Sequence, residues 1–121
     1  MSEQLQQFNK TRNSHNLSIL TDELRHNTQS AFGERLRKII MYGSYARGDF
    51  NEYSDLDIMV LAGYDKDDES QLESQINRIA NKASLDHDIT VCMLLNNERL
   101  FMSRLSISPF YRNVIAEGVE L

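Results

Sequence analysis

Two aspartates spaced two residues apart follow a Gly-Ser dipeptide, and these residue types suit the binding of a metal-bound nucleotide. Asp55 and Asp57 lie in an apolar segment with the pattern of a β-strand. Side chains of a strand alternate between its two faces, so both carboxylates are expected on one face. The intervening apolar residues are expected on the other: Leu56, Ile58 and Val60. The spacing therefore predicts a carboxylate pair that a divalent cation can bridge.

The Gly43-Ser44 dipeptide supplies the groups that a triphosphate needs. A glycine lets the backbone approach a phosphate closely, and the N–H groups after it can point at phosphate oxygens. Ser44 adds a hydroxyl donor, and residues 45–49 are expected to begin a helical turn. A Gly-Ser pair alone is usually an ordinary turn, so this prediction depends on its combination with the aspartates.

A third carboxylate, Asp88, opens an apolar segment that we interpret as another strand. Neighbouring strands lie about 4.8 Å apart, so Asp88 is expected to face the same cleft as Asp55 and Asp57 if the two strands pair. Three carboxylates suit two Mg²⁺ ions, one holding the triphosphate and one lowering the pKa of the attacking hydroxyl. Asp88 would then be the outer ligand or the base near the acceptor, and Asp86, on the same face, is a weaker substitute.

The elements that must position these residues follow from the spacing of apolar residues. Polar residues 1–15 are expected to be either a frayed segment or an outer turn of the first helix. The predicted order is helix, strand, strand, helix, strand, helix, helix in a single domain over residues 1–121. The corresponding ranges are 17–33, 36–42, 55–61, 67–83, 88–95, 98–105 and 109–116.

Composition narrows the class of protein. The net charge is −5 and the pI about 5.1, which argues against direct binding to a nucleic-acid backbone. No apolar run reaches the length of a membrane span and no signal peptide opens the chain. The single cysteine, Cys92, excludes a disulfide framework within the chain, and we expect a cytoplasmic protein. The glycine-lysine pattern of a P-loop is absent, and so is a plausible nucleophile–histidine pair.

The segment GSYARGDFNEYSDLDIMV resembles the signature of the nucleotidyltransferase superfamily related to DNA polymerase β, in particular its minimal nucleotidyltransferase (MNT) domains. The resemblance implies an α+β fold, with a small mixed sheet and helices packed mainly on one face. It implies Mg²⁺, two ions in all, and ATP as substrate. It also implies the site: Gly43, Ser44, Arg47 and Ser54 around the nucleotide, with Asp55, Asp57 and Asp88 as catalytic metal ligands.

Many MNT domains are antitoxins that act on a HEPN-domain ribonuclease toxin. The resemblance therefore implies transfer of AMP from ATP to a tyrosine of such a toxin, in a hetero-oligomer. Two alternatives stay open: an antitoxin that only binds its toxin, and a small-molecule nucleotidyltransferase of the aminoglycoside type. The short chain favours a macromolecular acceptor, and we expect apolar residues such as Phe101, Phe110 and Tyr111 to bind it.

Overall fold

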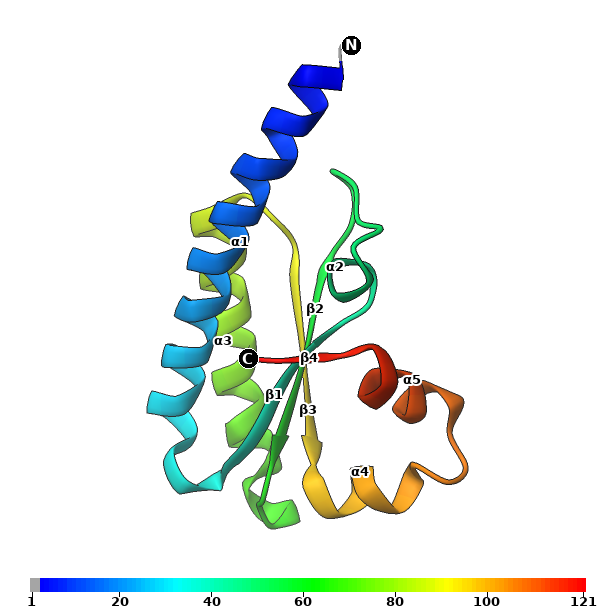
Figure 1. Ribbon diagram of the computed structural model, residues 1–121. Helices are drawn as coiled ribbons and strands as arrows, with labels where there is room; N and C mark the ends of the chain where they lie inside the picture. Colours follow the sequence, from blue (N-terminus) through cyan, green and yellow to red (C-terminus); the bar gives the residue numbers. More distant parts are fainter. Residues whose placement is uncertain (1–2) are drawn as a thin grey trace.

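The chain forms a four-stranded mixed sheet with helices on both faces (Figure 1). The computed structural model describes the backbone of residues 3–121 and the side chains from residue 16 onward. The strand order is β3-β2-β1-β4. The strands are β1 (Leu36–Tyr42), β2 (Leu56–Ala62), β3 (Val91–Asn97) and β4 (Val119–Glu120). Strand β1 pairs antiparallel with β2 and β4, whereas β2 and β3 are parallel. The predicted α+β class with a mixed sheet is confirmed.

Two long helices cover one face of the sheet: α1 (Glu3–Phe32) and α3 (Glu69–His87). Apolar residues at helical spacing on α1 and α3 pack against alternate residues of the strands. The centre of this core is fully buried and includes Leu24, Ile58 and Ile76. Short 3₁₀ turns, η1 (Gly33–Arg35) and η2 (Lys66–Asp68), connect the helices to the rest of the chain.

Two short helices, α4 (Glu98–Arg104) and α5 (Pro109–Glu117), pack against the opposite face. Each begins at a side-chain cap: the Asn97 amide oxygen accepts from the N–H groups of Arg99 and Leu100, and the Ser108 hydroxyl accepts from that of Tyr111. A second, smaller core forms beneath them from Ile40, Met59, Leu61, Phe101 and Val114. The larger core lies under α1 and α3, in agreement with the predicted packing of helices mainly on one face.

Several element boundaries differ from the sequence-based prediction. Helix α1 already begins at Glu3, and β4 was not expected at all. The predicted start of the third strand at Asp88 is wrong. Helix α3 continues through His87, Asp88 caps its C-terminus in a left-handed conformation with φ 51°, and β3 begins only at Val91. None of the helices in the described part of the chain is both long and apolar enough to cross a membrane.

Candidate active site

A sharp turn after β1 brings the Gly-Ser dipeptide next to the aspartates. Gly43 has φ +76° and ψ −155°, a conformation open to glycine almost alone. Its carbonyl oxygen accepts from the N–H groups of Ala46 and Arg47, both at 3.1 Å, and this starts the short helix α2 (Ser44–Arg47). The helical turn predicted after Gly43 is therefore present. It places Gly43 against Asp57 of β2, and Ser44 follows as the first residue of α2.

Asp55 and Asp57 are at the start of β2. The residues that alternate with them, Leu56 and Ile58, are fully buried under α1 and α3. Asp57 is half-buried and Asp55 is exposed. Burial, and next the charge of Asp55, raise the pKa of the Asp57 carboxyl, while the Arg47 guanidinium lowers it. The two carboxylates are thus close enough to repel each other, as the alternation of a strand predicts.

The aspartate pair fits one divalent cation. Two ionised carboxylates that repel each other gain most when a cation bridges them, and oxygen is the ligand that hard divalent ions prefer. Such an ion, when bound with a triphosphate, would neutralise charge on the phosphate oxygens. Asp55 and Asp57 would hold it, with the backbone of Gly43 and the hydroxyl of Ser44 beside the phosphates.

Strand pairing places Tyr42 and Cys92 on either side of Asp57. Tyr42 is its partner on β1 and Cys92 its partner on β3. Burial, and then the charges of Asp57 and Cys92, raise the pKa of Tyr42 to about 12. Burial, and then Asp55 and Asp57, raise the pKa of the Cys92 thiol. Both groups therefore stay neutral at physiological pH, and the aspartates supply the negative charge of the site.

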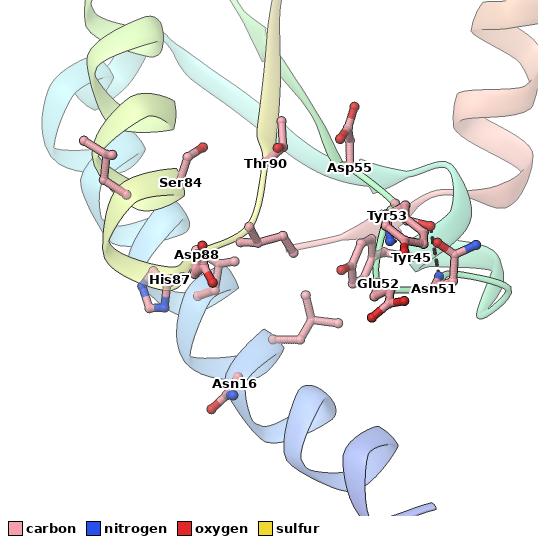
Figure 2. A pocket seen from close by; sticks show the side chains of 15 residues that line it. Asn16, Tyr45, Asn51, Glu52, Tyr53, Asp55, Ser84, His87, Asp88 and Thr90 are labelled. Atoms are coloured by element: carbon pink, nitrogen blue, oxygen red, sulfur yellow. Dashed lines mark hydrogen bonds between the residues drawn. The ribbon is translucent and has the colours of Figure 1, made fainter. Parts of the chain in front are cut away.

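The structure does not bring Asp88 together with Asp55 and Asp57. Asp88 lies beside His87 at the end of α3, on the wall of a cavity of about 700 Å³ that Asp55 also lines (Figure 2). Within residues 16–121, no three acidic, histidine or cysteine side chains are close enough to hold a metal ion together. Two of the three predicted carboxylates are adjacent, and the third is apart. The metal-binding role of Asp88 stays a prediction that this placement does not support.

Cys92 is a site residue that the sequence-based reasoning missed. Its Sγ donates to Asp55 Oδ2 at 3.8 Å. The signal was the alternation within β3: Val91 and Met93 are buried on the α1/α3 face, so Cys92 must point the opposite way. That signal becomes useful only once the register of β3 against β2 is known.

Arg47 and Ser54 already have partners within the chain. Arg47 Nε is 3.2 Å from Asp49 Oδ2, and its Nη1 is 3.3 Å from Glu117 Oε2 on α5. The Ser54 hydroxyl accepts from the N–H of Asn51 at 3.0 Å and so shapes the loop before Asp55. Both residues lie near the aspartate pair, Arg47 on α2 and Ser54 directly before Asp55. Their predicted contacts with a nucleotide stay predictions.

A match to a family model defines the class of the chain. Residues 21–116 match the family model of the nucleotidyltransferase domain, and this range includes Gly43, Ser44, Asp55 and Asp57. The chain belongs to this family. Its members transfer nucleotides from nucleoside triphosphates, in general with a divalent metal, and this chain has the glycine turn and the aspartate pair in place.

Two relatives agree with this class. The protein named "Putative protein adenylyltransferase MJ0604" of Methanocaldococcus jannaschii is 34% identical over 74% of this chain and 82% of its own. A second protein of that organism, named "Putative protein adenylyltransferase MJ0141", is 34% identical over 60% of this chain and 72% of its own. A crystal structure of a toxin–antitoxin with AMP-PNP is similar, with TM-score 0.48 and 22% identity over 80% of this chain and 68% of that one.

Proposed function

We propose that this protein is an adenylyltransferase that moves AMP from ATP to a hydroxyl group of a partner protein. The observation that carries the proposal is the aspartate pair, Asp55 and Asp57, held next to the Gly43-Ser44 turn at the start of β2. The names of the relatives from Methanocaldococcus jannaschii support a protein as acceptor. The resemblance to MNT antitoxins favours a tyrosine of a HEPN-type toxin as the hydroxyl, in the cytoplasm.

In this reaction the acceptor oxygen attacks the α-phosphorus of ATP. The bond from that phosphorus to the bridging oxygen of the β-phosphate breaks, pyrophosphate leaves, and the acceptor proton passes to solvent water. Gly43 and Ser44 would bind the phosphates, and Asp55 and Asp57 would hold a Mg²⁺ ion that accompanies them. A bound cation supplies charge neutralisation at the phosphate oxygens. The chain's own contribution is to align the triphosphate along the start of β2.

An exposed apolar surface beside the aspartate pair supports a protein acceptor. Phe110 and Ile107, on and just before α5, are 45% and 76% exposed. Phe110 packs its ring edge-to-face against Tyr42, with centroids 5.8 Å apart, and Tyr42 is the strand partner of Asp57. Apolar side chains that reach solvent are common at protein interfaces. A partner docked on α5 would thus lie next to the nucleotide.

The test is transfer of labelled AMP. The protein is incubated with α-labelled ATP, Mg²⁺ and the HEPN-type toxin proposed as its partner, and intact mass spectrometry then counts the AMP groups on the toxin. We expect AMP on the toxin with the wild type, at least about 100-fold less with Asp57→Asn, and no loss with Asp67→Asn. Asp67 is an exposed aspartate on η2, away from Asp55 and Asp57. If the wild type leaves the toxin unmodified and Asp57→Asn still neutralises it, the proposal is wrong.

A second candidate is an antitoxin that neutralises its toxin by binding alone. One observation favours it: among the side chains of residues 16–121, two carboxylates are adjacent where two-ion transfer needs three. The same experiment separates the candidates, because binding without transfer leaves the mass of the toxin unchanged. Toxin neutralisation by Asp57→Asn would then equal that by the wild type.

A further inference from the structure

The side chain next to Asp57 on β3 is a thiol. Cys92 is the register partner of Asp57 in the parallel β2–β3 pair, and its Sγ lies 3.8 Å from Asp55 Oδ2. Residues paired across neighbouring strands point to the same face. Cys92 therefore stands on the face that carries the aspartate pair, and β3 contributes this residue to it.

No carboxylate of β3 joins the pair. Asp88, the nearest acidic residue before β3, sits in the left-handed turn that ends α3. Asp55 and Asp57, by contrast, are at the start of β2 and next to Gly43. Transfer with two Mg²⁺ ions needs carboxylate oxygens for both, and sulfur is a poor ligand for so hard an ion. In the part of the chain whose side chains the structure describes, the residues fit one ion and do not fit two.

We infer that Cys92 occupies the position where a two-ion site would need its third carboxylate, so that Asp55 and Asp57 hold a single divalent cation in this chain. The inference rests on the proposed nucleotidyl transfer. It means that the ion accompanying the triphosphate binds, while a second ion at the acceptor hydroxyl does not. Deprotonation of the acceptor then limits the rate, and Cys92→Asp supplies the missing ligand.

Counting bound Mn²⁺ tests the inference without relying on catalysis. The intact chain is titrated with Mn²⁺ in the presence of saturating AMP-PNP, and electron paramagnetic resonance measures the free ion. Mn²⁺ bound to nucleotide that is free in solution is subtracted. We then expect one protein-bound Mn²⁺ per wild-type chain and two per chain of Cys92→Asp. Cys92→Asn, which has the shape of aspartate without its charge, should bind one. Circular dichroism checks that Cys92→Asp is folded. If it is not, the number of Mn²⁺ ions on the wild type tests the inference without this variant.

The outcomes separate the inference from the proposed function. Two Mn²⁺ ions on the wild type, or one on a folded Cys92→Asp, overturn the inference and leave the proposed function standing. If the wild type binds neither Mn²⁺ nor AMP-PNP, both the inference and the proposed function are wrong. As a second readout, Cys92→Asp should raise the rate of AMP transfer at saturating ATP by about tenfold or more, with Cys92→Asn at or below the wild-type rate. A transfer rate equal in Cys92→Asp and Cys92→Asn would also overturn the inference.

Discussion

Gly43 lies so close to Asp57 that a Cβ atom on residue 43 would be 2.5 Å from Asp57 Oδ2. Real Cβ atoms essentially never come this near to another heavy atom, so the carboxylate would have to move. The backbone of residue 43 also has φ +76°, which strains any other residue. The glycine and the aspartate therefore depend on each other, and this contact joins the turn that we propose binds the phosphates to the strand that we propose binds the metal.

The first prediction concerns Gly43→Ala. The new methyl group displaces the Asp57 carboxylate, so AMP transfer and Mn²⁺ binding should each fall at least about 100-fold. The strained backbone should cost about 1–3 kcal/mol in the free energy of unfolding, measured with urea. Gly48→Ala is the matched control. Its φ is +85°, but nothing lies within 4 Å of the added Cβ, so it should lose similar stability and keep Mn²⁺ binding. Equal losses of binding in both variants would contradict this prediction.

The second prediction concerns the charge of Asp57. Its pKa is higher in the folded chain than its ordinary value, so between the unfolded and folded pKa values the folded state binds more protons. The contribution of Asp57 to stability is thus fully present below its unfolded pKa, about 3.9, and is lost as the pH rises through its folded pKa. In EDTA, Asp57→Asn should lack this fall and should melt at or above the wild-type temperature at pH 7. Asp67→Asn should follow the wild type.

Metal addition reverses the order of the two melting temperatures. Mg²⁺ with ATP should raise the melting temperature of the wild type, since a ligand at 100 times its dissociation constant adds about 2.7 kcal/mol. Asp57→Asn should show no such rise, because one of the two carboxylates that hold the ion is gone. A wild type that melts above Asp57→Asn in EDTA, or an equal gain with Mg²⁺ and ATP, would count against the aspartate pair as the metal site.

The sequence predicts the parts of this fold that have strong local signals. The apolar run before Gly43 marks β1 at the observed bounds, Leu36–Tyr42, and alternation places the aspartate pair on one face of β2. Ser108-Pro109 marks the start of α5, as observed. These features depend on neighbouring residues only, which a single sequence contains.

The errors arise where a boundary or a contact depends on distant residues. Helices often end at a glycine, but α3 ends at Asp88, which takes the left-handed conformation itself. The polar segment before it was therefore not recognised as helix, and Asp88 was assigned to the strand. The two residues of β4 pair with β1 through backbone hydrogen bonds, so they leave no side-chain pattern. The place of Cys92 beside Asp57 follows only from the β2–β3 register.

The third prediction concerns Arg47. Arg47 follows Ser44 by one helical turn on α2, and its charge lowers the pKa of Asp57. If Arg47 binds a phosphate of ATP, Arg47→Ala should raise the KM for ATP about tenfold, because a charge-assisted hydrogen bond is lost. Glu117→Gln removes one partner of Arg47 but keeps the guanidinium, so KM should stay the same or fall. A rise of KM in both variants would show that Arg47 acts by tying α2 to α5 instead.

The last prediction separates the fold from the partner surface. The sequence indicated Phe101, Phe110 and Tyr111 as apolar partner residues, but Phe101 is fully buried in the second core. Phe101→Ala should lower the free energy of unfolding by about 3–5 kcal/mol, and any loss of partner binding should follow from unfolding. Phe110 is partly exposed and lies against Tyr42. Phe110→Ala should therefore keep most of the stability and weaken binding of the proposed HEPN-type partner at least about tenfold.

Ile19→Ala is the matched control for Phe110→Ala. Ile19 is 49% exposed but lies on α1, which covers the opposite face of the sheet. Isothermal titration calorimetry measures the binding of each variant, and a melting curve shows that each is folded. Equal binding by Phe110→Ala and the wild type, or an equal loss with Ile19→Ala, would mean that the partner does not dock on α5. A loss confined to Phe110→Ala would place the partner beside Tyr42, and through Tyr42 beside Asp57, where the acceptor hydroxyl must reach the nucleotide.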